Sequence, residues 1–143
     1  AKHLVKDLRS VLQSMRRSLT AIKRRAGKVV AESRARIEER VNALLADVGT
    51  RIDEATLARE VALLADRSDV REELTRLAAH VDEFVGYLGS EDEVGRTLEF
   101  LAQEMLREAN TIGSKSSDVT LARAVIALKS DIDRLKEQVA NLE

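Results

Sequence analysis

A helical spacing of apolar residues continues through the first 48 residues, and this feature limits the fold more than any other. From Leu4 to Val48 apolar side chains recur every three or four residues, and polar Ser33 fills the one gap. The mean step of about 3.7 residues is close to that of a straight helix. The chain contains no proline that could interrupt it. We therefore expect one long helix over residues 1–48, ended by Gly49, because glycine adopts the left-handed conformation without a Cβ penalty.

The length of this helix constrains the tertiary structure. At about 1.5 Å per residue it approaches roughly 70 Å, whereas the radius of gyration of a compact domain of this size is about 15 Å. The helix must therefore protrude, bend or pack along another chain.

The rest of the chain predicts four more helices, at about residues 53–66, 69–88, 93–112 and 117–142. Their expected start and stop signals are Asp69 with Glu72, Ser90 with Glu93, Ser116 or Ser117, Gly89 and Gly113. The last helix alternates apolar spacings of four and three over three heptads, which predicts a coiled-coil seam. Few glycines and aromatic residues argue against strands.

These patterns indicate an all-α fold, in which a long protruding N-terminal helix precedes a helical bundle with a C-terminal coiled-coil helix. Packing the last helix along the first is the most economical arrangement. The apolar periods of the two helices differ, however, so the sequence leaves the pairing open.

Charge divides the chain into a basic and an acidic part. Residues 1–40 hold 12 Lys or Arg against 4 Asp or Glu, and residues 41–143 hold 12 against 21. We therefore distinguish a basic helical arm, 1–48, from an acidic helical domain, 49–143. The arm could bind a polyanion or dock on the acidic part of a neighbouring subunit. Because aromatic residues are scarce, contacts to the backbone of a nucleic acid are expected rather than base stacking.

The expected cellular location rests on the lack of cysteine and of a long apolar segment in the sequence. No cysteine is present, which agrees with a reducing compartment, and no apolar run is long enough to cross a bilayer. We expect a cytoplasmic protein that does not insert into a membrane.

Two of the expected helices carry polar residues beside their apolar ridges. The residues are Asp69, Glu73, Arg76 and His80 on the third helix, and Glu104 and Glu108 on the fourth. In an antiparallel hairpin these side chains could form an oxygen-rich site for Mg²⁺ or Mn²⁺. The plainer alternative, surface ion pairs and a hydrogen-bonded histidine, is the commoner arrangement. Motifs of zinc proteases, phosphate-binding loops and serine hydrolases are absent from the sequence.

Three segments resemble the C-terminal part of the YicC/YloC family of bacterial metal-dependent endoribonucleases. They are LAREVALLADRSDVREELTRLAAHVDEF at 57–84, VGRTLEFLAQEMLREANTIGSKSSD at 94–118, and the closing LKSDIDRLKEQVANLE. LVKDLRS at 4–10 resembles the family's long helix after its N-terminal domain. That domain, with its M-T-G-F opening, has no counterpart here, so we expect a fragment of a longer protein.

Individual positions fit the family's motifs. EELTRLAAH, which contains Glu73 and His80, fits E-E-x-x-R-L-x-x-H. The second motif, Q-E-M-N-R-E-x-N-T-x-G-S-K, is matched by Glu104, Arg107, Glu108, Asn110 and Lys115. Departures from the pattern are Thr97, Glu99 and Leu106, which stand where the family has Lys, Asp and Asn.

The resemblance implies a hexameric enzyme that cleaves RNA phosphodiester bonds with a divalent metal ion, Mn²⁺ or Mg²⁺. As hypotheses, the catalytic residues are Glu73, His80, Glu104 and Glu108, and the same four with Asp69 bind the metal. The expected RNA contacts are Arg76, Arg96, Arg107, Asn110 and Lys115, with Arg24 and Arg25 of the arm. The alternative is a non-catalytic helical module that oligomerises and binds RNA for a larger protein.

Overall fold

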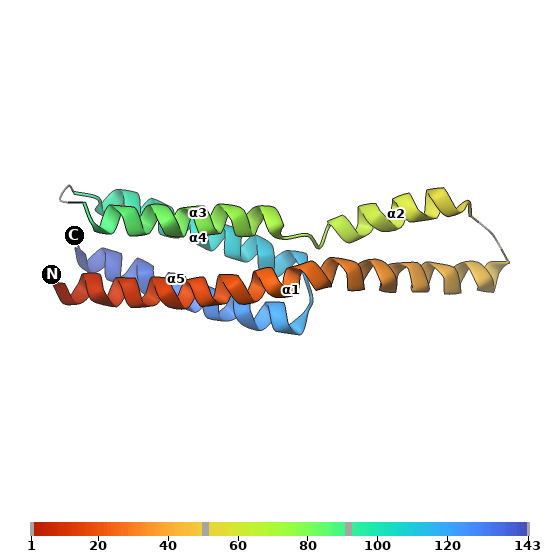
Figure 1. Cartoon of the computed structure of the whole chain (residues 1–143), viewed down its shortest axis with the longest axis horizontal. Coiled ribbons are helices and arrows are strands. Elements are labelled where there is room, and N and C mark those ends of the chain that lie inside the picture. Colours follow the sequence, from red (N-terminus) through yellow and green to blue (C-terminus); the bar gives the residue numbers. More distant parts are fainter. Residues whose placement is uncertain (1, 50–51, 91–92, 143) are drawn as a thin grey trace.

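The computed structural model describes residues 2–49, 52–90 and 93–142. Within these ranges the chain forms five helices and no strand (Figure 1). The helices are α1 (Lys2–Val48), α2 (Glu54–Asp66), α3 (Arg71–Leu88), α4 (Gly95–Lys115) and α5 (Val119–Leu142). The all-α prediction is confirmed, and so is the long N-terminal helix, which contains 47 residues.

A four-helix bundle is formed by the N-terminal half of α1 together with α3, α4 and α5 (Figure 1). Their buried apolar side chains make one continuous core, which on α1 extends from Leu8 to Val29. Contacts at both ends of α5 show that it runs antiparallel to α1: Gln138 donates to Asp7 at 2.8 Å, and Arg25 donates to Asp118 at 2.7 Å. The structure therefore settles the pairing that the sequence left open, with α5 along α1.

Beyond the bundle, the C-terminal half of α1 continues as a two-helix extension with α2 (Figure 1). Val61 and Ala65 are the buried residues of α2, whereas Leu44, Leu63 and Leu64 are exposed. The change of packing partner thus occurs inside α1. The expected boundary between the arm and the domain, at residue 48, coincides with the end of α1 but not with this change of packing partner. The apolar spacing along a helix does not change where its neighbours change, so the sequence does not mark that point.

Helix ends agree with the sequence signals at some positions. Gly49 has a φ of +66° directly after α1, as expected of a left-handed stop. Asp53 caps α2 by accepting a hydrogen bond from the backbone N–H of Thr56 at 3.2 Å. Gly89 follows α3 but with a φ of −87°. The end at Gly49 was thus predicted with its mechanism and the end at Gly89 by position, whereas the capping bond of Asp53 was not predicted.

The expected N-terminal caps of the three later helices were only partly right. Val70 precedes α3 without a side-chain capping bond, but the Asp69 carboxylate accepts a hydrogen bond from the backbone N–H of Arg71, the first residue of α3, at 3.0 Å. Val94 precedes α4 and makes no side-chain capping bond. The start of α5 is capped by Asp118, whose Oδ2 accepts from the backbone N–H of Leu121 at 3.0 Å, rather than by Ser116 or Ser117. Serine and aspartate both suit a cap, and spacing alone cannot choose between neighbours.

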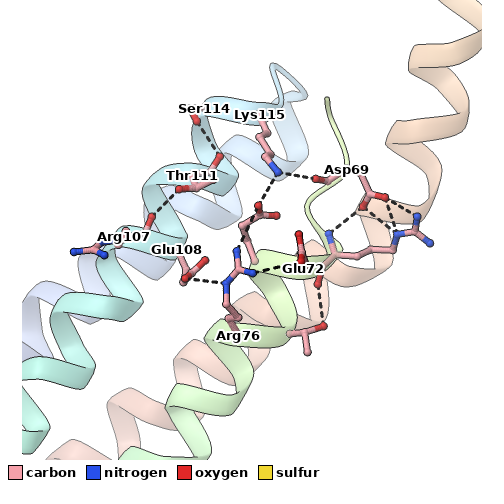
Figure 2. Close-up of polar contacts among 11 residues, drawn as sticks. Asp69, Glu72, Arg76, Arg107, Glu108, Thr111, Ser114 and Lys115 are labelled. Atoms are coloured by element: carbon pink, nitrogen blue, oxygen red, sulfur yellow. Dashed lines mark hydrogen bonds and ion pairs between the residues drawn. The ribbon is translucent and has the colours of Figure 1, made fainter. Parts of the chain in front are cut away.

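Gly113 was expected to end α4, but the helix continues to Lys115. A Cβ added at Gly113 would lie 3.3 Å from Cγ1 of Val125 on α5. The glycine therefore serves the close approach of two helices and not a turn. The residues beyond Gly113 place Lys115 at the end of α4, where it faces the start of α3 (Figure 2).

None of the described helices is long and apolar enough to span a membrane.

Candidate functional site

The candidate site lies along the seam between α3 and α4, which pack against each other (Figure 1). Ligand atoms of His80 on α3 and of Glu104 and Glu108 on α4 all lie within 4.8 Å of one another. We call these three residues the acid–imidazole cluster. Glu108 is 7% exposed, whereas His80 and Glu104 are half-buried and reachable from solvent. The cluster therefore has a buried side and an open side.

The donor atoms of the cluster suit a divalent cation. Nδ1 of His80 is buried and has no hydrogen-bond partner in the described part of the chain, because Oε1 of Glu83, at 3.9 Å, is too distant. A buried polar atom without a partner is costly and rare. One imidazole and two carboxylates are a ligand set that proteins use for first-row divalent metals. The residues present therefore fit a metal ion.

Arg76 orients the buried carboxylate of the cluster. Its Nε donates to Oε1 of Glu108 at 3.1 Å, across the seam (Figure 2). This hydrogen bond and the charge of Glu108 raise the pKa of Arg76. The Arg76 guanidinium also lies 3.7 Å from the carboxylates of Glu72 and Glu73. A carboxylate has about four lone-pair positions, so the bond to Arg76 leaves Glu108 able to bind a cation.

Glu73 lies on the same seam but pairs with Lys115 instead of joining the cluster. Nζ of Lys115 donates to Oε1 of Glu73 at 2.6 Å and to the backbone oxygen of Asp69 at 3.3 Å. Burial alone would raise the pKa of Glu73, which is 3% exposed. The hydrogen bond and charge of Lys115, with a backbone bond and the charge of Arg76, outweigh burial and lower that pKa. The pair ties the last turn of α4 to the first turn of α3.

Asp69 is also separate from the cluster. Its carboxylate accepts hydrogen bonds at 3.0 Å from the backbone N–H and the guanidinium of Arg71. The side-chain bond from Arg71 lowers the pKa of Asp69 despite partial burial. The expected set of five metal ligands therefore divides: three converge, while Asp69 and Glu73 form ion pairs. Positions that share a helical face are still separated along the axis, and seven residues correspond to about 10 Å.

The expected RNA contacts differ in whether they are engaged across the seam between α3 and α4. Arg76, although exposed, is engaged with Glu108, and Lys115 is engaged with Glu73. Arg96, Arg107 and Asn110 are exposed on α4, and Arg107 lies 3.5 Å from Glu104 of the same helix. These three residues are the ones not held by a bond across the seam.

On the arm, Arg24 is exposed and Arg25 is held in a network of acidic residues. Arg25 donates through Nε and Nη2 to both carboxylate oxygens of Asp118, at 3.0 and 2.7 Å, and through its guanidinium to Glu32. These hydrogen bonds raise the pKa of Arg25, and the bond from Arg25 lowers the pKa of Asp118 to about 2. Arg25 therefore stabilises the contact of α1 with the start of α5.

Sequence reasoning missed Phe100, which lies on α4 one turn before Glu104. It is 61% exposed, an unusual environment for a phenylalanine. The available signal was its position off the apolar ridge formed by Leu98, Leu101 and Met105, all of which are buried.

Comparisons with known proteins show which family the chain resembles. Residues 22–143 match the family described as "Endoribonuclease YicC-like, C-terminal". The chain is 37% identical over 142 residues to a Clostridioides difficile protein named "Probable endoribonuclease YicC", an alignment that covers 99% of the chain and 48% of that relative. It is 40% identical over 105 residues to a Haemophilus influenzae protein of the same name, covering 73% of the chain and 37% of the relative.

The chain thus spans about half the length, or less, of these curated relatives. The family match covers most of the chain and includes every residue of the acid–imidazole cluster. The chain belongs to the YicC-like endoribonuclease family and corresponds to its C-terminal region.

Proposed function

We propose that this chain carries the metal site of an endoribonuclease, and that the acid–imidazole cluster binds the metal. The observation that supports this most directly is the convergence of His80, Glu104 and Glu108 from two helices, with ligand atoms within 4.8 Å. RNA as the substrate is supported by the names of the relatives, both of which are called probable endoribonucleases.

The roles of the residues follow from their positions in the cluster. Glu108, Glu104 and His80 would hold the cation, and Arg76 keeps the buried carboxylate of Glu108 in place. A bound divalent cation would supply Lewis-acid stabilisation of negative charge on the phosphoryl oxygens. A mixed nitrogen and oxygen set suits Mn²⁺ better than Mg²⁺, which prefers oxygen ligands alone.

The exposed basic residues of α4 would position the RNA. Arg107 adjoins Glu104, and its side chain is largely in solvent, so it can reach a phosphate beside the cluster. Arg96 and Asn110 lie on the exposed side of the same helix. Lys115 has a different role, because its ammonium group is engaged by Glu73 and holds the two helices together.

We also propose that the protein forms a homo-oligomer in the cytoplasm, a hexamer by family resemblance. Exposed apolar residues gather on the two-helix extension, where Leu44, Val48, Leu63 and Leu64 have no cover within the described chain. Burial of such residues against another subunit would be favourable.

A second candidate function is a non-catalytic module that oligomerises and binds RNA. It is favoured by one observation: the chain spans only about half the length of its relatives, so residues required for catalysis could lie outside it.

Metal binding is tested by titrating Mn²⁺ into the 143-residue chain by calorimetry. We expect Glu104→Gln to weaken Mn²⁺ binding at least tenfold, in line with loss of a ligand. The matched control is Glu99→Gln, the same change at an exposed position of α4. Equal affinities of the two variants, or no Mn²⁺ binding by the unchanged chain, would contradict the proposed site.

Cleavage is tested separately with end-labelled RNA, with and without Mn²⁺. The proposed enzyme cuts the RNA only with the metal, and Glu104→Gln abolishes cutting while Glu99→Gln does not. Retention of RNA on a native gel without scission would favour the binding module.

A further inference from the structure

The two phenylalanines of the chain occupy opposite environments. Phe84 on α3 is fully buried in the core of the bundle, whereas Phe100 on α4 is 61% exposed. The buried ridge of α4 is complete without Phe100, since Leu98, Leu101 and Met105 supply it. Packing within the bundle therefore gives no reason for a large aromatic ring at this position.

Two exposed arginines lie on the same face of α4 as Phe100, close to the acid–imidazole cluster. At about 100° per residue, Arg96, Phe100 and Arg107 lie within about 40° of one another around α4. All three are exposed. Among the described residues, Arg96 makes no ion pair. Nη2 of Arg107 lies 3.5 Å from Oε1 of Glu104, and the Arg107 side chain remains largely exposed. Glu104 follows Phe100 by one turn, a spacing that makes side chains neighbours on a helix surface.

We propose that Phe100 is a stacking platform for an unpaired RNA base, with Arg96 and Arg107 binding the phosphates on either side. The inference rests on the proposed function, because it takes RNA as the ligand and the cluster as the reacting centre. A base stacked on Phe100 places the adjoining phosphodiester beside Glu104. The preferred substrate is then single-stranded RNA, with little discrimination between bases, because every base offers a π-face.

The composition of this face favours a nucleic acid over a second protein. Phe100 is exposed on a helix surface that also carries Arg96, Gln103, Arg107 and Asn110, with the carboxylates of Glu99 and Glu104 beside it. Subunit interfaces are depleted of charge at their centres and apolar over a continuous patch. Two cations flanking one aromatic ring match a phosphate backbone with an exposed base.

The test compares two substitutions of Phe100 that separate the aromatic ring from apolar character. Phe100→Leu keeps an apolar side chain without a ring, and Phe100→Trp keeps a ring. Binding of the 143-residue chain to a short fluorescein-labelled single-stranded RNA, and to a duplex of the same sequence, is measured by anisotropy with EDTA present to prevent cleavage. We expect Phe100→Leu to weaken single-strand binding roughly fivefold or more, because one stacked base is lost. Phe100→Trp retains the affinity, and duplex binding is unchanged in both.

A second readout reports stacking itself. The fluorescence of a 2-aminopurine placed in the single-stranded RNA should change on binding to the unchanged chain and to Phe100→Trp, but much less on binding to Phe100→Leu. Thermal unfolding by circular dichroism checks that the variants fold, as an exposed position predicts.

Three results would overturn the proposal: unchanged single-strand affinity in Phe100→Leu, equal losses in Phe100→Leu and Phe100→Trp, or no RNA binding by the unchanged chain. A change in sedimentation of Phe100→Leu would instead identify the face as a contact between copies, and would also overturn it. These results are distinct from failure of the proposed function, which is read from Mn²⁺ binding and Mn²⁺-dependent scission. Loss of stacking with scission intact removes only the role of Phe100.

Discussion

The four-helix bundle and the two-helix extension differ in how they bury the same kind of helix. Within the bundle, α1 packs against α3 and α5, and its apolar ridge is buried in a continuous core. Within the extension, α1 meets only α2, and large apolar residues such as Leu44 and Leu63 remain exposed. One uninterrupted helix therefore passes from a well-buried to a poorly buried environment. Local stability follows burial and not helix length, and the candidate site lies in the well-buried region.

The largest effect should come from opening a cavity in the bundle. Phe84→Ala is expected to reduce the free energy of unfolding by about 3–5 kcal/mol, because a fully buried ring is removed. Leu63→Ala in the extension, where the side chain is 57% exposed, should change it by less than about 1 kcal/mol. Urea unfolding followed by circular dichroism gives both values. Similar losses would show that the extension is as tightly packed as the bundle and would contradict the comparison.

A smaller loss is expected from breaking the pair between Lys115 and Glu73, at the end of the bundle that faces the extension. Lys115→Met leaves a buried carboxylate without its partner and should cost about 1.5–3 kcal/mol. Lys136→Met, which removes a surface bond to Gln103, is the matched control and should cost less than about 1 kcal/mol. Adding Glu73→Gln to Lys115→Met should recover part of the loss, since no buried charge then remains. If the double variant is no more stable than Lys115→Met, the buried charge is not the cause.

The smallest effect concerns the pH dependence of the contact between Asp118 and Arg25, where α1 leaves the bundle. The pKa of Asp118 falls from an ordinary value of 3.8 to about 2. A lowered carboxyl pKa contributes stability that is present above pH 3.8 and is lost as the pH falls towards 2. Asp118→Asn should therefore flatten the pH profile of stability in this range, while its side chain can still cap α5.

Stability measured by urea unfolding between pH 2 and pH 5 gives the profile for Asp118→Asn. Asp133→Asn, at an exposed position of α5, is the control and should keep the profile of the unchanged chain. A profile for Asp118→Asn that is as steep as that of the control would mean that other carboxylates hold the junction.

Much of the site was accessible from the sequence, and the reason is the helical period. His80, Glu104 and Glu108 each flank an apolar ridge, so an antiparallel hairpin brings them to one seam. Glu73 flanks the same ridge, but its partner Lys115 could not be anticipated, because Gly113 signals a helix end and the helix continues. The signal at Gly113 failed since a glycine needed for close packing and a glycine needed for a turn look the same in a sequence.

By itself the sequence determined that the chain is helical, approximately where each helix lies, and which side of each helix is apolar, because these depend on neighbours along the chain. Only the tertiary structure decided that α5 packs on the first half of α1, that α2 packs on the second half, and that three of five candidate ligands converge. Those outcomes depend on axial position and on contacts between residues far apart in the sequence. Such contacts are selected by the fit of whole helix surfaces, which no local spacing of residues records.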